Sequence, residues 1–186
     1  MKKIWNLPNQ LTIARFFMTI VFFLLLHYGH YGIAFMTFVL TGLTDFLDGY
    51  AARRSNLTTD FGRLADPITD KILSVGGFVM LQDICPMIIR PWMTVILVAR
   101  EFLASGIRSY AEAHGVAFAA DYWGKSKMVL QILSIGGVVL YMWRLRSDGF
   151  VLLVTVITYG AVIATFISGL RYFWRGYRVL EDISSA

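Results

Sequence analysis

The chain alternates long apolar runs with short polar breaks, and this pattern predicts helices. The expected helices cover about 7–27, 31–54, 59–82, 86–113, 121–144 and 148–178. At about 1.5 Å per residue, each is long enough to cross a hydrocarbon core roughly 30 Å thick. The short links between the runs favour antiparallel neighbours in a compact bundle.

Polar residues at the breaks supply helix start signals. Asn6 precedes a proline at position 8, which suits the first turn of a helix. Thr59, Asp121 and Asp148 each stand at a predicted start, where a side-chain oxygen can accept a backbone N–H. We therefore expect these residues to cap their helices.

Composition changes this picture from a helical protein to a membrane protein. Hydrophobic residues make up 57% of the 186 positions and charged residues only 16%, where a soluble domain carries about 25%. We expect an all-α, polytopic membrane protein: a six-transmembrane-helix bundle forming one domain over residues 1–186. The net charge of +5 is assigned to anionic lipid, not nucleic acid. Cys85 is the sole cysteine, which excludes an intrachain disulfide.

Lysine and arginine are distributed unequally between the two predicted sides of the bundle. The side with both termini collects Lys2, Lys3, Arg53, Arg54, Arg63, Arg108, Lys125, Lys127, Arg171, Arg175 and Arg178. The opposite side has only Arg90, Arg144 and Arg146. By the positive-inside rule, both termini lie in the cytoplasm, and the protein is a multi-pass protein of the cytoplasmic (inner) membrane.

Four carboxylates interrupt the apolar pattern around the link between the second and third helices. Asp45 and Asp48 are three residues apart, and Asp66 and Asp70 are four apart, so each pair projects from one helix face. Because the two helices are expected to run antiparallel, the acids can meet across one cavity near the cytoplasmic face. Intramembrane acids are costly and usually functional. Oxygen ligands alone suit two hard cations, Mg²⁺ or Mn²⁺.

Small residues and an arginine stand among these acids. Gly49, Ala52 and Gly62 serve close helix packing, and they also let a nucleotide approach the backbone. Arg53 can hold a phosphate in a bidentate fork or anchor the helix at the membrane surface.

The full spacing, D-x-x-D-G-x-x-A-R-x8-G-x3-D-x3-D, resembles the signature of the CDP-alcohol phosphotransferases. Its fixed positions are Asp45, Asp48, Gly49, Ala52, Arg53, Gly62, Asp66 and Asp70. The resemblance implies attack of an alcohol on a CDP-linked lipid with release of CMP. It further implies that the first three acids, together with the fourth, hold two divalent metals. The resemblance also implies that the nucleotide diphosphate and the CDP-lipid are bound by Asp45, Gly49, Ala52, Arg53 and Gly62. Asp70 is implied to be the general base.

Two further stretches, 6–15 and 99–115 followed by 123–131, resemble the branch of that family that uses sn-glycerol 3-phosphate. The implied product is phosphatidylglycerol phosphate, made from CDP-diacylglycerol among the membrane lipids. A phosphorylated acceptor needs a second anion site, and the candidates are Arg100, Arg108, Lys125 and Lys127. For Arg100 the competing interpretation is an ion pair with Glu101 or a cluster acid; for the lysines it is membrane anchoring.

Some alternatives stay open. Inositol-phosphate, cardiolipin and serine branches share the acidic core, and a cation transporter could use acids differently. Asn9, Thr12 and Arg15 stay outside the expected catalytic set, although Arg15 needs an anion such as a lipid phosphate. The sequence does not decide the preferred metal, the acyl chains or whether the protein is a homodimer.

Overall fold

The sequence folds into helices throughout the described part of a computed structural model. The backbone is described for residues 7–55, 60–114 and 122–184; side chains are described within these ranges except at 7–8, 45–55, 60–64, 122–123, 125, 179–180 and 182–184. These ranges form α1 (Leu7–His27), α2 (Tyr31–Ser55), α3 (Asp60–Ile84), α4 (Pro91–Ala113), α5 (Tyr122–Trp143) and α6 (Asp148–Ser184). The prediction of an all-α chain with six helices is confirmed.

The predicted start of the fourth helix at residue 86 is wrong by five residues. The carbonyl of Cys85 accepts hydrogen bonds from the N–H groups of Ile88 and Ile89, both at 3.1 Å, which closes a turn. Both isoleucines are buried, so this turn is tied to the core. The helix then begins at Pro91, where a missing N–H costs nothing.

The last helix begins at Asp148, as predicted, but its capping residue and its end differ from the prediction. Its cap is Ser147, whose hydroxyl accepts a hydrogen bond from the N–H of Phe150 at 3.3 Å. Asp148 is not the cap; it lies in the first turn, where its charge complements the helix dipole. The helix continues to Ser184, beyond the expected end at 178.

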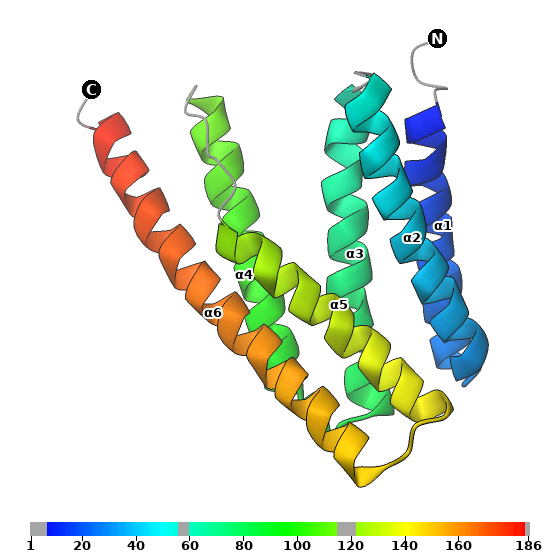
Figure 1. Ribbon diagram of the computed structural model, residues 1–186. Coiled ribbons are helices and arrows are strands. Elements are labelled where there is room, and N and C mark those ends of the chain that lie inside the picture. Colours follow the sequence, from blue (N-terminus) through cyan, green and yellow to red (C-terminus); the bar gives the residue numbers. More distant parts are fainter. Residues whose placement is uncertain (1–6, 56–59, 115–121, 185–186) are drawn as a thin grey trace.

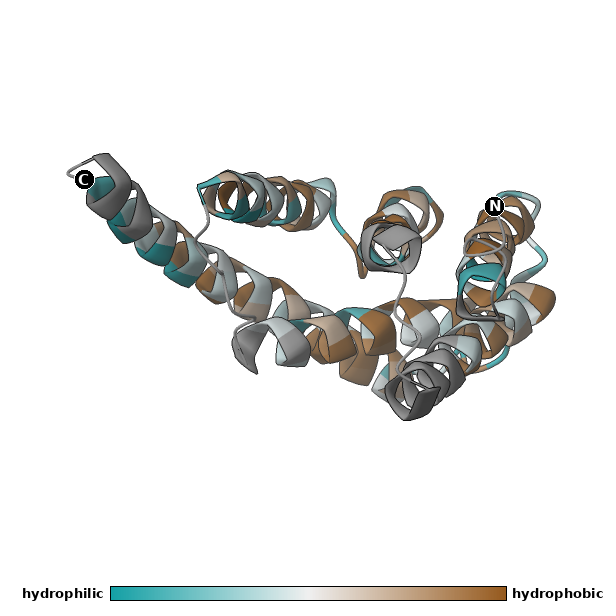
Figure 2. Ribbon diagram, turned by 90° about the horizontal axis from the view of Figure 1, so that it is seen from above, coloured by the Kyte–Doolittle hydropathy of each residue, from teal (hydrophilic) through white to brown (hydrophobic). Residues whose placement is uncertain are grey.

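The helices form two layers (Figures 1 and 2). One layer contains α1, α3 and α4, and the other contains α2, α5 and α6. Across the layers, α1 packs on α2, α3 on α5 and α4 on α6. The described ends of α1 and α6 nearest the termini lie at the same end of the molecule (Figure 1), as an even number of crossings requires.

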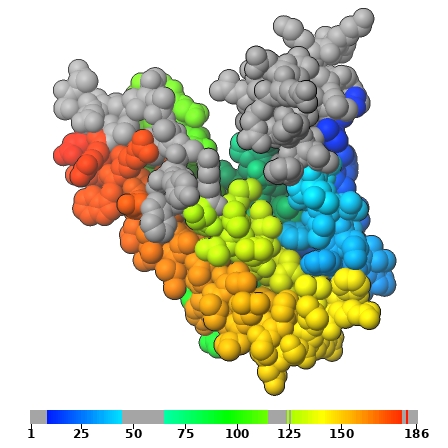
Figure 3. Space-filling view, viewed as in Figure 1, coloured from blue at the N-terminus to red at the C-terminus, as the bar shows by residue number. Residues whose placement is uncertain are grey.

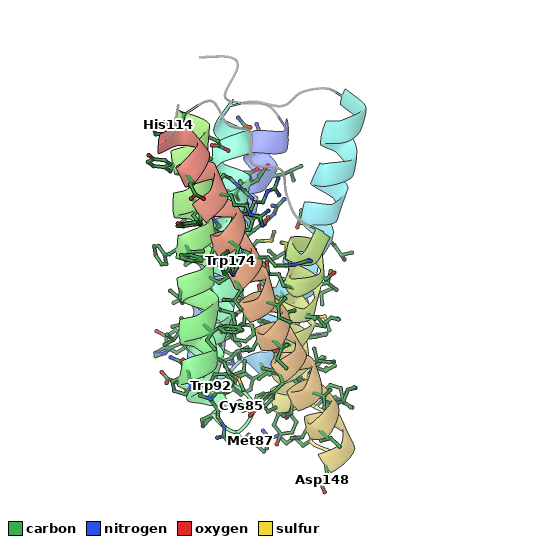
Figure 4. The ribbon with its side chains drawn as sticks, turned by 90° about the vertical axis from the view of Figure 1, so that its left-hand side faces the viewer. Cys85, Met87, Trp92, His114, Asp148 and Trp174 are labelled. Atoms are coloured by element: carbon green, nitrogen blue, oxygen red, sulfur yellow. The ribbon has the colours of Figure 1, made fainter. Side chains whose placement is uncertain are left out.

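The end of the bundle away from the termini is closed by an apolar core. This end carries Cys85, Met87 and Asp148, opposite His114 (Figure 4). All six helices contribute to the core, which includes Phe22, Phe38, Phe78, Leu97, Ile135 and Val154. A methyl group at Gly77 would lie 2.7 Å from Cδ1 of Ile135, so the glycine lets α3 and α5 approach closely. Close van der Waals packing of this kind holds helices together in lipid.

Within the residues that the structure describes, three helices are long and apolar enough to cross a membrane: 9–27 in α1, 126–143 in α5 and 148–178 in α6. In α2, the apolar part that the structure describes is the shorter segment Tyr31–Thr44. The described parts of α3 and α4 carry more charged residues, including Asp70 and Arg100. These two helices supply Asp70 and Arg100 to the site.

Candidate active site

Two of the signature acids lie on α3, supported by α1. Asp66 and Asp70 are one turn apart on α3. The hydroxyl of Thr12 donates a 2.6 Å hydrogen bond to Oδ1 of Asp66. Nη1 of Arg15 lies 3.5 Å from Oδ1 of Asp70 in an ion pair. We call these two acids, with their partners on α1, the acidic wall.

The local sequence explains this arrangement. Thr12 and Arg15 are three residues apart, so they share one face of α1, and α1 packs directly on α3. Both α1 side chains are buried, whereas Asp70 keeps about a third of its side chain exposed (32%). The anion expected for Arg15 is thus met within the protein by Asp70, where the sequence had offered lipid phosphate as a partner.

Asp70 lines a cavity of about 260 Å³. In the space-filling view, α6 (orange to red) lies on the opposite side of the molecule from α1 and α2 (blue to cyan) (Figure 3). Four helices supply the lining of the cavity: α3, α4, α5 and α6. The polar lining residues are Asp70, Lys71, Ser74, Arg100, Glu101, Arg108, Lys127, Gln131 and Tyr172. Among the described lining side chains, cations therefore outnumber acids four to two.

The cations are held by hydrogen bonds between helices. Nη2 of Arg100 on α4 donates to the hydroxyl of Ser168 on α6 at 2.8 Å, and Nη1 donates to Oε1 of Glu101 at 3.1 Å. Nη2 of Arg108 donates to the buried hydroxyl of Tyr172 at 2.9 Å. The same tyrosine ring stacks near Arg100, with 5.5 Å between Cζ and the ring centroid.

The two lysines have equally defined positions. The ammonium of Lys127 contacts Oε1 of Glu101. Nζ of Lys71 donates to the hydroxyl of Ser105 at 2.5 Å, and that hydroxyl donates to the backbone oxygen of Glu101 at 2.7 Å. We call Lys71, Arg100, Arg108 and Lys127, with these partners, the cationic wall.

Donor capacity remains on the cationic wall. Nε of Arg100 and Nε of Arg108 are buried and have no hydrogen-bond partner among the described residues. A buried donor without an acceptor is costly. Together with the excess of cations, these donors make the cavity chemically suited to an anion.

The structure brings together part of the predicted site. Asp66 and Asp70 share the acidic wall, and Asp70 shares one cavity with Arg100, Arg108 and Lys127. Arg100 pairs with Glu101, as one interpretation expected, and it also lines the cavity; its binding of a phosphate stays a prediction. The predicted residues Asp45, Asp48, Gly49, Ala52, Arg53, Gly62 and Lys125 lie outside the described side chains.

Of the four predicted metal ligands, only Asp66 and Asp70 are among the described side chains. Among the side chains that the structure describes, no group of three histidine, cysteine, aspartate or glutamate residues is close enough to hold a metal. Asp66 and Asp70 supply carboxylate oxygens from one helix face, which is the donor chemistry of hard cations. The residues present therefore fit Mg²⁺ or Mn²⁺ in kind.

Sequence reasoning missed several members of the cationic wall. Lys71 directly follows a signature acid in an apolar segment, and this position was the available signal. Tyr172 and Ser168 lie on α6, where the surrounding sequence is mostly apolar and contains no motif that singles them out. Their role depends on contacts with α4, more than 60 positions away, which single-helix periodicity does not report.

Comparison with known proteins identifies the class. A family model for CDP-alcohol phosphatidyltransferase matches residues 5–167, and the chain belongs to this family. The resemblance based on the acidic signature is thereby confirmed. Together with the three apolar helices, the family membership makes this an integral membrane protein.

Relatives from several bacteria cover nearly the whole chain. A Bacillus subtilis protein named CDP-diacylglycerol–glycerol-3-phosphate 3-phosphatidyltransferase is 29% identical, over 95% of this chain and 98% of its own length. A Rickettsia typhi protein of the same name is 36% identical, over 90% of this chain and 95% of its own length. A Mycobacterium tuberculosis protein named probable phosphatidylglycerophosphate synthase is 34% identical, over 97% and 86% respectively.

Proposed function

We propose that the chain transfers the phosphatidyl group of CDP-diacylglycerol to sn-glycerol 3-phosphate. The products are phosphatidylglycerol phosphate and CMP, in phospholipid biosynthesis. Family membership and the printed activity of the relatives support this reaction. The observation that carries the acceptor is the cavity in which Asp70 and four cations lie together. A phosphomonoester carries close to two negative charges at neutral pH, matching the excess of cations.

The acceptor phosphate binds on the cationic wall. Arg100 and Arg108 offer planar guanidinium groups, and their unsatisfied Nε donors gain acceptors when phosphate oxygens enter. Lys127 and Lys71 add charge from α5 and α3. Lys125, outside the described side chains, belongs to the same basic segment and is assigned to this site.

The lipid donor binds at the acidic signature. Asp45, Asp48, Asp66 and Asp70 hold two Mg²⁺ or Mn²⁺ ions, and Thr12 orients Asp66 among them. When bound, such ions neutralise the diphosphate and stabilise the leaving nucleotide. Asp45, Gly49, Ala52, Arg53 and Gly62 bind the CDP moiety, with Arg53 on a phosphate.

The reaction joins the two walls. Asp70 accepts the proton of the primary hydroxyl of glycerol 3-phosphate as the oxygen attacks the lipid-side phosphorus. The bond from that phosphorus to the oxygen of CMP breaks, and CMP leaves with both bonding electrons. The cationic wall orients the acceptor, so the hydroxyl faces Asp70 and not water.

An apolar groove adjoining the cavity suits an acyl chain. The groove measures about 430 Å³ and lies between α3 and α4. Its apolar lining includes Ile72, Val75, Val98 and Phe102, and it shares Lys71 and Glu101 with the cavity. A lipid tail lying here would place its phosphate next to the reacting groups.

The same proposal covers the arrangement in the membrane. The whole chain is one six-span domain of the cytoplasmic membrane, with both termini and the metal site facing the cytoplasm. The termini-bearing ends of α1 and α6 lie at one end of the bundle (Figure 1), which supports an even number of spans. Five charged side chains of α3 and α4 line the cavity, so these helices can cross with those side chains away from lipid. They are Asp70, Lys71, Arg100, Glu101 and Arg108. A homodimer is compatible with this arrangement.

The test is CMP release by purified protein in detergent, with CDP-diacylglycerol, Mn²⁺ or Mg²⁺ and one acceptor per reaction. We expect release with glycerol 3-phosphate and none with inositol phosphate, serine or phosphatidylglycerol. Release with a different acceptor alone would contradict the acceptor assignment and leave the donor chemistry intact. No release from folded protein with any acceptor would favour a transport role for the acids.

A further inference from the structure

Glu101 is an acid placed within the cationic wall. Its side chain is only 12% exposed, and those of its two partners, Arg100 and Lys127, are 9% and 8% exposed. A buried carboxylate beside a proposed phosphate site opposes the anion's charge, so its presence requires an explanation. The acidic signature does not include it, and the reaction described above does not use it.

The contacts of Glu101 give the explanation. One atom, Oε1, meets both Nη1 of Arg100 on α4 and the ammonium of Lys127 on α5. The backbone oxygen of Glu101 accepts from Ser105, which in turn accepts from Lys71 on α3. Glu101 thus connects three of the four cations, which belong to three different helices.

The dependence on Glu101 differs between the cations. Arg100 is also held by Ser168 and by the ring of Tyr172. Lys127 contacts no hydrogen-bond acceptor other than Glu101 among the described residues. Without a negative charge between them, the ammonium and the guanidinium would repel each other, and a lone buried ammonium is strongly disfavoured. Glu101 therefore keeps both cations charged together on one wall.

We infer that Glu101 is a positioning residue for the acceptor phosphate. It holds Arg100 and Lys127 side by side so that their remaining donors converge on a phosphomonoester, and it sets the affinity for the acceptor without contacting the diphosphate of the lipid donor. This inference rests on the proposed function, because it takes glycerol 3-phosphate as the anion bound in the cavity.

The test is a comparison of Glu101→Gln with the wild-type protein in CMP release. Glutamine keeps the shape and removes the charge. We expect the KM for glycerol 3-phosphate to rise about tenfold, equivalent to one displaced charge-assisted hydrogen bond, while kcat and the KM for CDP-diacylglycerol change less than about threefold. Thermal stabilisation of the purified protein by glycerol 3-phosphate, measured without the lipid donor, should weaken in parallel.

The matched control is Glu112→Gln. Glu112 lies on the same helix but is exposed and does not line the cavity, so its variant should keep the wild-type KM. If E101Q does not fold, the Glu101→Asp variant tests the role of Glu101 in its place. This variant keeps the charge and withdraws the carboxylate by one methylene. That variant should raise the KM for glycerol 3-phosphate about threefold; an unchanged value would overturn the inference.

The outcomes separate the two claims. If the wild-type protein releases CMP with another acceptor but not with glycerol 3-phosphate, the proposed function is contradicted. With wild-type turnover present, an unchanged or lowered KM in E101Q overturns the role of Glu101 alone. An equal rise in KM for both substrates also overturns it, since that is the signature of a merely structural residue.

Discussion

The acidic wall and the cationic wall, which meet at the cavity through Asp70, are built in different ways. Asp66 and Asp70 come from one helix, a single turn apart, and are supported by two side chains of α1. The cations come from α3, α4 and α5, and residues of α4 and α6 fix them. A wall made by one helix can be specified by a short spacing in the sequence, whereas a wall made by several helices depends on the whole fold.

The difference also concerns what each wall leaves available. Asp70 keeps a third of its side chain exposed toward the cavity, as expected of a group that must meet a substrate. Arg100 and Lys127 are almost fully buried and prearranged by a carboxylate. The acidic wall is thus suited to chemistry and the cationic wall to orientation, and variants of the two walls should have different kinetic signatures.

The largest effect is expected from Asp70→Asn, which removes the base from the acidic wall. Loss of a general base typically costs about 10²–10⁴-fold in rate, so CMP release should fall by that order. The KM for glycerol 3-phosphate should change much less, because the cationic wall is intact. The control is Asp83→Asn, an exposed acid at the other end of the same helix, which should keep full activity. Activity of D70N near the wild-type level would remove Asp70 from the mechanism.

A smaller effect on the same wall is expected from Thr12→Val. The variant deletes the hydroxyl that donates to Asp66 and keeps the side-chain shape. Loss of such an outer-shell hydrogen bond lowers metal affinity by about tenfold. The measurement is the Mn²⁺ concentration that gives half-maximal thermal stabilisation, checked against the concentration that gives half-maximal activity. Thr37→Val serves as the control, since that hydroxyl bonds only the carbonyl of Ile33 in its own helix. Equal Mn²⁺ dependence in T12V and wild type would contradict a role for Thr12.

On the cationic wall, Tyr172→Phe should act on the acceptor alone. It removes the hydroxyl that holds Arg108 and keeps the ring beneath Arg100. A net loss of about 1 kcal/mol for one hydrogen bond corresponds to a roughly fivefold rise in the KM for glycerol 3-phosphate. Initial rates over a range of acceptor concentrations at saturating lipid would measure it. A fall in kcat with an unchanged KM for glycerol 3-phosphate would contradict a role of Tyr172 in acceptor binding.

The smallest effect is expected from Gly169→Ala. An added Cβ would lie 3.1 Å from Cγ of Arg100, so the arginine stem must shift by a few tenths of an ångström. We expect about a twofold rise in the KM for glycerol 3-phosphate, equivalent to a mild steric displacement. Gly160→Ala on the same helix meets nothing within 4 Å and should leave the KM unchanged. Identical KM values for the two variants would show that Arg100 tolerates the shift.

The sequence predicted the helices well because membrane helices must satisfy their backbone hydrogen bonds internally, so apolar runs map directly onto helices. It failed at residues 86–90, where two buried isoleucines continue the apolar pattern through a turn. Hydropathy reports burial and lipid exposure, not backbone conformation. The predicted start of the fourth helix, at residue 86, therefore lies before the observed start at Pro91.

The parts of the site that lie on one helix could be predicted from the sequence, whereas the contacts between helices could not. Asp66 and Asp70 follow a fixed spacing on one helix, and they do share one wall. Arg100 stood out as a charge within a predicted span. Arg100 is held by Ser168, and Arg108 is held by Tyr172. These contacts could not be predicted without knowing that α4 and α6 lie side by side. Glu101 was considered only as a neighbour of Arg100, because its contact with Lys127 crosses from α4 to α5.

The central claim is that both walls act on one bound acceptor. The most direct measurement is an experimental structure of the wild-type protein with Mn²⁺ and sn-glycerol 3-phosphate. We predict that the phosphate lies within hydrogen-bond distance of Arg100 and Arg108, with the primary hydroxyl directed toward Asp70. A phosphate bound outside this cavity, or a hydroxyl directed away from Asp70, would contradict the account.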